Sequence, residues 1–197
     1  MNTQEFGAKT TLKDQQALMI KRLFLGVSPT QDQAQILAHT QSLISTDGRA
    51  IPKDNFHVTL YFLGQVDELQ QTQLINALNQ LNAQNKLKRF SVDLEAIEWW
   101  QKPKVICQAG TAKDFALIKL YKTCRQLSHE LNLHQSEHPF TPHITLFRKA
   151  REYYPRQIPP LTITAHELHL YHSVSGESGE SGVSYPIIHS WPLMPIY

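Results

Sequence analysis

Two short segments of almost the same sequence hold the residues best suited to chemistry. Each contains a histidine, a β-branched aliphatic residue, a threonine and a leucine, and they run His57–Leu60 and His143–Leu146. A chain of this composition contains roughly 0.01 such tetrads by chance. The pair therefore indicates either a functional repeat or a duplication that preserved a structural one.

Both tetrads fit β-strands, in which alternate side chains point to opposite faces. In the first, Val58 and Leu60 would be buried on one face, and the histidine and Thr59 would share the other. The second predicts the same division, with Thr145 beside His143. If two lobes meet about a rough two-fold axis, these polar faces oppose each other across a cleft.

Two imidazoles that face each other suit phosphoryl transfer without a metal ion. The ordinary histidine pKa of about 6.5 lets one ring be neutral and the other charged near pH 7. The neutral ring accepts a proton from the attacking group, and the charged ring donates one to the leaving oxygen. In-line displacement places these two oxygens on opposite sides of phosphorus. The threonine hydroxyls can donate to the non-bridging oxygens.

The elements around the tetrads follow an order that repeats weakly along the chain. Apolar runs and alternation predict strands at 21–27, 56–63, 90–99, 104–109, 140–147, 161–172 and 184–191. Helical periodicity covers 30–46, 68–87 and 114–133. We expect Gly64 to end the second strand and 175–182 to form a turn. The order predicts an α+β, bilobal fold with pseudo-two-fold symmetry, each lobe an antiparallel sheet backed by helices.

Composition narrows the class of protein. The chain has 197 residues, 41% of them hydrophobic, which suits one domain, and we interpret residues 1–20 as a polar N-terminal extension. Its formal net charge of +2 is too small for capture of long nucleic acid by charge alone. Cys107 and Cys124 are expected to be free thiols. The lack of a long apolar stretch predicts a cytoplasmic protein without a membrane partner.

The tetrads and their flanks resemble the paired signatures of the 2H phosphoesterase superfamily. The matching segments are Arg22–Phe24, Asn55–Gly64, Pro139–Leu146 and Leu170–Ser173. Within the superfamily they are most similar to the RNA 2′,3′-cyclic phosphodiesterases, first described as 2′–5′ RNA ligases. The resemblance extends from about residue 21 to residue 194 and implies a single bilobal domain over 21–197, with the active site between the lobes.

The resemblance also implies an activity and roles for particular residues. The expected reaction is hydrolysis of a 2′,3′-cyclic phosphate, on an RNA end or a nucleotide, to a 2′-phosphate by a monomer without cofactor or metal. By analogy, His57 protonates the departing 3′ oxygen and His143 activates water. Arg148 stands where the family usually carries arginine and is expected to bind phosphate with Thr59 and Thr145. A solvated arginine at a strand end is the alternative.

Several readings stay open at this point. The same site would suit a 2′–5′ RNA ligase, a 2′–5′ oligonucleotide phosphodiesterase, or a nucleotide- or RNA-binding module without turnover. Tyr61 and Phe147 are expected either to stack on a base or to pack between the lobes. The segment Trp99–Lys104 departs from the family pattern. A metal site built on His166, His169 and His172 is disfavoured by their spacing.

Overall fold

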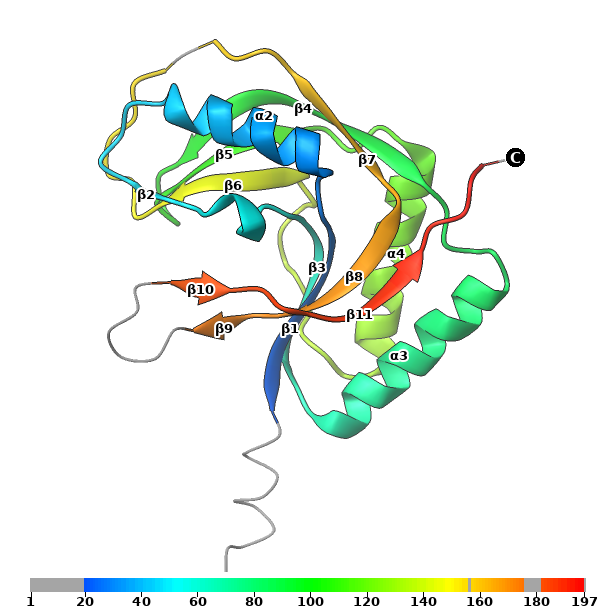
Figure 1. Cartoon of the computed structure of the whole chain (residues 1–197). Helices are drawn as coiled ribbons and strands as arrows, with labels where there is room; N and C mark the ends of the chain where they lie inside the picture. Colours follow the sequence, from blue (N-terminus) through cyan, green and yellow to red (C-terminus); the bar gives the residue numbers. More distant parts are fainter. Residues whose placement is uncertain (1–19, 156, 176–181, 197) are drawn as a thin grey trace, which may run out of the picture.

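The computed structural model describes residues 20–155, 157–175 and 182–196 (Figure 1). The N-terminal extension and most of the turn predicted at 175–182 lie outside these ranges. The larger strands are β1 (Lys21–Val27), β3 (Val58–Val66), β4 (Phe90–Trp100), β5 (Val105–Gly110), β6 (His143–Arg148), β7 (Leu161–Ala165), β8 (Glu167–His172) and β11 (Ile187–Pro192). Two-residue strands are β2 (Arg49–Ala50), β9 (Val174–Ser175) and β10 (Val183–Ser184). The helices are α2 (Gln31–Ser42), α3 (Glu68–Ala83), α4 (Phe115–Glu130) and the 3₁₀ turn η1 (Lys53–Asn55).

The main sheet is antiparallel and consists of two matching halves. Its strand order is β11-β8-β1-β3-β6-β5-β4-β7, with β2 added beside β6. The unit β1–α2–β3 in the first half corresponds to β5–α4–β6 in the second. The halves are joined between β3 and β6 through one residue pair, Val58 with Ile144. The predicted α+β fold is confirmed, and the sheets of the two lobes form one hydrogen-bonded sheet at this pair.

Two helices, α2 and α4, each pack against a strand of the other half. The helix α2 follows β1 in the first half but packs against β6, whereas α4 follows β5 and packs against β3 and β4. Each begins at a side-chain cap, Thr30 for α2 and Asp114 for α4, which accepts hydrogen bonds from backbone N–H groups of the first turn. Leu37 and Leu117 are fully buried beneath these helices. Burial of each leucine contributes about 1.5–3 kcal/mol to the junction.

The single strand predicted over 161–172 is wrong, because this segment forms two strands in different halves of the sheet. Strand β7 pairs with β4 at one edge, and β8 lies between β1 and β11. The buried positions alternate in β7, at Ile163 and Ala165, whereas β8 has four buried residues in succession, Leu168 to Tyr171. The exposed residue His166 stands between the two strands, and its carbonyl accepts a hydrogen bond from Leu193. Strand β7 therefore buries one face, whereas β8, which lies between β1 and β11, is buried on both.

The prediction that Gly64 ends its strand is also wrong. The strand β3 continues to Val66, and Gly64 adopts a φ of 77° inside it. The pairing with β1 shifts register between Leu23 and Phe24, where one extra residue of β3 is accommodated. Such a bulge needs a backbone conformation that glycine adopts readily. The glycine therefore bends the strand and does not terminate it.

Candidate active site

The two tetrads lie at the junction of the halves. His57 directly precedes β3, and His143 is the first residue of β6. The aliphatic residues that follow, Val58 and Ile144, are fully buried and pair with each other. Gly26 of β1 permits the close approach of strands here, because a Cβ at that position would lie 2.6 Å from the Val58 carbonyl oxygen. The histidines and threonines are half-buried on the opposite face, as the alternation predicts.

Matched hydrogen bonds orient the two imidazoles. His57 Nδ1 lies 2.8 Å from the carbonyl oxygen of Asn55, and His143 Nδ1 lies 2.8 Å from that of Thr141. A carbonyl oxygen only accepts hydrogen bonds, so Nδ1 must carry the proton in both rings. In a neutral ring this leaves a lone pair on Nε2. Both histidines therefore present the same nitrogen for proton exchange.

Aromatic rings surround His57. The ring centroids of Phe24, Tyr171 and Tyr185 lie 4.8, 5.6 and 4.7 Å from its own. Burial lowers the pKa of His57 to about 4, although the hydrogen bond to Asn55 opposes this. The positive charges of His143 and Arg148 contribute to this lowered value. His57 is consequently neutral at pH 7 in the free protein.

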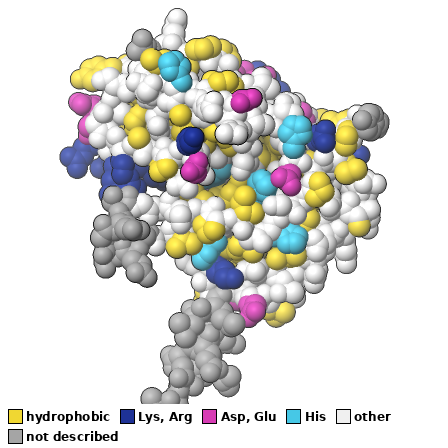
Figure 2. Space-filling view, in the orientation of Figure 1, with side chains coloured by type: hydrophobic (Ala, Val, Ile, Leu, Met, Phe, Trp, Pro, Cys, Tyr) yellow, Lys and Arg dark blue, Asp and Glu magenta, His cyan; other side chains and the backbone are white. Residues whose placement is uncertain are grey.

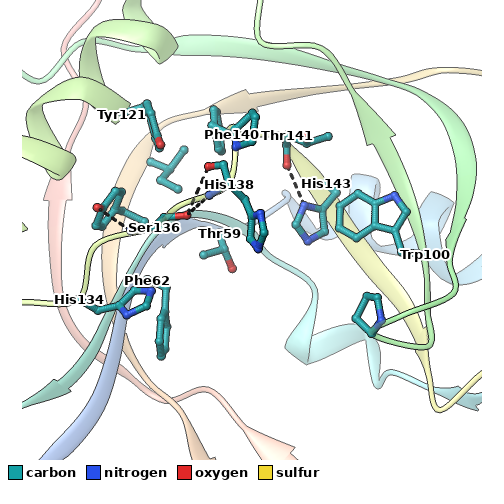
Figure 3. Close-up of a pocket in the computed structure, with 14 residues that line it drawn as sticks. Thr59, Phe62, Trp100, Tyr121, His134, Ser136, His138, Phe140, Thr141 and His143 are labelled. Carbon is teal, nitrogen blue, oxygen red and sulfur yellow. Dashed lines mark hydrogen bonds between the residues drawn. The ribbon is translucent and has the colours of Figure 1, made fainter.

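His143 has a different environment. The indole of Trp100 packs against it, with ring centroids 4.5 Å apart and planes inclined by 63° (Figure 3). Burial lowers the pKa of His143, and the hydrogen bond to Thr141 opposes this effect. The Arg148 charge lowers the pKa as well, whereas the carboxylate of Glu98 raises it. Among the charges that act on the two rings, Glu98 is specific to His143.

Arg148 lies at the end of β6, within electrostatic reach of both histidines. It is half-buried, and one terminal nitrogen donates to the Tyr185 hydroxyl at 3.3 Å. Its Nε is buried and has no hydrogen-bond partner among the described residues. A guanidinium N–H in this situation suits a phosphate oxygen. A fully solvated arginine, the alternative considered from the sequence, does not describe this side chain.

A cavity of about 550 Å³ opens beside His143 and Thr59. Its walls also include Trp100 and the stacked rings of Tyr121 and Phe140, whose centroids are 4.7 Å apart (Figure 3). In the space-filling view, hydrophobic and histidine side chains gather near the middle of this face (Figure 2). The volume is typical of a small-molecule site. Sequence patterns did not indicate Tyr121, Phe140 or Tyr185, because no local period links them to the tetrads.

Tyr61 and Phe147 both pack in the hydrophobic core, with 2% and 7% of their surfaces exposed. Of the two alternatives considered from the sequence, packing is confirmed. The Tyr61 hydroxyl accepts a hydrogen bond of 3.4 Å from the backbone N–H of Ser136, and this side chain also lines the cavity. Phe147 follows the second tetrad directly, and its side chain fills the core.

His169 and the two cysteines are buried outside the cavity, whereas His134 and His138 line its wall. His169 is buried, and its Nδ1 lies 2.8 Å from the Ser190 hydroxyl. Within the described ranges, no group of three or more His, Cys, Asp or Glu residues is arranged to hold a metal ion. Cys107 and Cys124 are free and buried, and burial raises the pKa of each thiol to about 12. The described part of the chain contains no helix that could cross a membrane.

Fold and site together define a two-lobed α+β protein with matched His-x-Thr segments at the junction of its halves. Residues 25–107 match the family described as LigT like Phosphoesterase. The chain is 30% identical over 134 residues to the RNA 2′,3′-cyclic phosphodiesterase of Escherichia coli K12, covering 67% of this chain and 74% of that protein. The protein of the same name from Thermotoga maritima is 27% identical over 143 residues, covering 66% and 72%. The chain therefore belongs to the LigT-like, or 2H, phosphoesterase family.

Solved structures agree with this assignment. The crystal structure of E. coli LigT complexed with 3′-AMP superposes with a TM-score of 0.74 and 27% identity, over 88% of this chain and 98% of that one. The apo form of E. coli LigT gives a TM-score of 0.74 at 25% identity, over 89% and 99%. The resemblance inferred from the tetrads and their flanks is confirmed.

Proposed function

We propose that this protein hydrolyses a terminal 2′,3′-cyclic phosphate, on RNA or on a nucleotide, to a 2′-phosphomonoester. The main support is the pair of imidazoles from the two halves. Each donates a hydrogen bond from Nδ1 to a backbone carbonyl, which leaves Nε2 available for proton transfer. The buried, unpartnered Nε of Arg148 adds a group suited to the phosphate. The similar proteins of E. coli and T. maritima are named RNA 2′,3′-cyclic phosphodiesterases.

The two histidines have opposite roles in this reaction. His143 Nε2 accepts a proton from water as the water oxygen bonds to phosphorus. His57 Nε2 donates its proton to the 3′ oxygen as the P–O3′ bond breaks, so the phosphate stays on the 2′ oxygen. The attacking and leaving oxygens lie on opposite sides of phosphorus, which suits an acid and a base supplied by opposite halves. Each positioned proton transfer contributes about 10²–10⁴-fold to the rate.

His57 can act as the acid only if substrate binding protonates it. Its pKa is about 4 in the free protein, mainly because of burial. A bound phosphate anion favours the charged form of a nearby imidazole and so raises the pKa. Thr59, Thr145 and Arg148 would donate hydrogen bonds to the non-bridging oxygens and stabilise the charge that develops there. These steps use no metal ion.

Product analysis tests the proposal. The protein is incubated in EDTA with adenosine 2′,3′-cyclic phosphate, and separately with a cyclic-phosphate RNA and a 5′-hydroxyl RNA. We expect 2′-AMP as the product and loss of the cyclic end without joining. A 3′-phosphate product, or turnover that EDTA abolishes, would contradict the proposal. Joined RNA would identify a 2′–5′ ligase, and binding without turnover would identify a binding module.

A further inference from the structure

Two side chains near the end of β4 form a connected arm beside His143. The indole Nε1 of Trp100 donates a hydrogen bond of 2.6 Å to the Glu98 carboxylate. The same indole packs against the imidazole with centroids 4.5 Å apart (Figure 3). Trp100 also lines the cavity of about 550 Å³ beside His143, so the arm borders the space next to the reacting nitrogen. Glu98 itself is exposed to solvent.

We propose that Glu98 and Trp100 are positioning residues for His143. The carboxylate fixes the indole, and the indole holds the imidazole so that Nε2 stays directed into the cleft. The inference rests on the proposed function in one respect, that His143 transfers a proton. In this scheme both residues affect the reaction through the imidazole.

The need for such an arm follows from how few contacts fix His143. Its hydrogen bond from Nδ1 to Thr141 sets the torsion of the ring about Cβ–Cγ but leaves the faces of the ring to be held by packing. At His57 the rings of Phe24, Tyr171 and Tyr185 supply that packing. At His143, within the described part of the chain, Trp100 supplies the aromatic ring contact. A charge-assisted hydrogen bond to a carboxylate is strong enough to orient an indole.

The arm also shapes the electrostatics of the base. The charged groups that act on His143 are Arg148 on its own strand and Glu98 on β4, and His57, across the junction, is neutral at pH 7. The indole excludes water from the ring and so lowers its pKa, whereas the carboxylate charge raises it. The two members therefore act in opposite directions, and their removal should shift the pKa with opposite signs.

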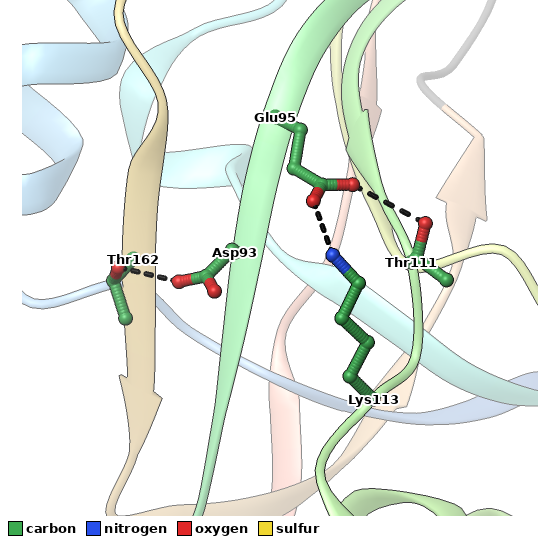
Figure 4. Close-up of polar contacts among 5 residues, drawn as sticks. All are labelled: Asp93, Glu95, Thr111, Lys113 and Thr162. Atoms are coloured by element: carbon green, nitrogen blue, oxygen red, sulfur yellow. Dashed lines mark hydrogen bonds and ion pairs between the residues drawn. The ribbon is translucent and has the colours of Figure 1, made fainter.

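Imidazole nitrogen NMR on the whole, substrate-free protein measures this directly. We expect Glu98→Gln to lower the pKa of His143, and Trp100→Ala to raise it and mix the two tautomers. Glu95→Gln is the matched control, since this carboxylate lies on the same strand but bonds to Lys113 and Thr111 (Figure 4). Equal shifts for Glu98→Gln and Glu95→Gln, or an unchanged pKa and tautomer in Trp100→Ala, would overturn the proposal.

Kinetics adds a readout that a merely structural role would not give. Trp100→Phe removes the donor and Glu98→Ala the acceptor, so each should lower kcat about tenfold with little change in KM. The double variant should lose little more than either single, because both break the same link. If the double variant lost kcat by the product of the two single losses, the two residues would act independently and the proposal would be wrong. If the native protein shows no turnover, the proposed function fails, while the NMR experiment still decides this inference.

Discussion

The two histidines share a motif and a backbone hydrogen bond but differ in the aromatic rings and in the carboxylate charge around them. Each donates from Nδ1 to the carbonyl two residues earlier in the chain. His57 is enclosed by three aromatic rings, which lowers its pKa to about 4. His143 packs against the indole of Trp100, and the charge of the Glu98 carboxylate raises its pKa. The repeated fold therefore supplies the carbonyl acceptor at each Nδ1, whereas residues outside the repeat hold the rings in place and set their proton affinity.

This difference bears on which ring donates and which accepts. In the free protein the Glu98 charge favours a proton on His143, whereas the charges from described residues that act on His57, those of His143 and Arg148, disfavour one. The proposed roles require the opposite distribution in the complex, with His57 charged. The substrate phosphate must therefore supply the negative charge that the surroundings of His57 lack. Variants of each half can break or sharpen this contrast.

Removal of either imidazole should have the largest effect. We expect His57→Ala and His143→Ala each to lower kcat by about 10³-fold or more, roughly 4 kcal/mol, because each removes one proton transfer. Steady-state hydrolysis of adenosine 2′,3′-cyclic phosphate measures the loss. The exposed His166→Ala variant serves as the control. Retention of activity within tenfold in either variant would show that the two halves do not both take part.

The buried state of His57 should also appear in stability. In the unfolded chain this group binds a proton near pH 6.5, but in the folded protein only near pH 4. Stability is therefore lost as pH falls from about 6.5 towards 4, by about 3 kcal/mol from His57 at most. Urea unfolding at pH 7 and pH 4.5 measures the loss, which should be smaller in His57→Ala. If the native protein and His57→Ala lost the same stability between pH 7 and pH 4.5, His57 would not have the lowered pKa described here.

Arg148 serves both halves and should matter for both binding and rate. We expect Arg148→Ala to lower kcat/KM about 100-fold, roughly 2.7 kcal/mol, because the phosphate loses a charged donor. Arg148→Lys should recover only part, since an ammonium lacks the planar array of donors. Arg151, which is exposed, provides the matched control. A similar loss in Arg151→Ala would show a general effect of charge.

The threonines should give the smallest effects. Thr59→Val and Thr145→Val each remove one hydroxyl donor and should lower kcat about tenfold, roughly 1.4 kcal/mol. Thr59→Ser and Thr145→Ser retain the hydroxyl and should stay near the native rate. Of these two threonines, Thr59 lines the cavity of about 550 Å³ beside His143 and Thr145 does not. Loss of the Thr59 hydroxyl should therefore also raise KM. Serine variants as slow as the valine variants would point to packing.

Local alternation predicted the parts of the site that local geometry controls. It placed Val58 and Ile144 in the core and the histidines on the other face. It did not reveal the break at His166, because no glycine or proline interrupts 161–172. Nor did it bring Trp100 to His143, a contact between β4 and β6, which are separated in the sheet by β5. Contacts of that kind depend on tertiary structure.

The most direct test of the opposite roles uses a substrate in which sulfur replaces the 3′ oxygen. A thiolate leaves without help from an acid, since thiols have a pKa of about 8.5. The rates of His57→Ala and His143→Ala are compared on this analogue and on the ordinary cyclic phosphate. We predict that the analogue restores most of the activity lost in His57→Ala and little of that lost in His143→Ala. Rescue of His143→Ala instead, or equal rescue of both, would contradict the account.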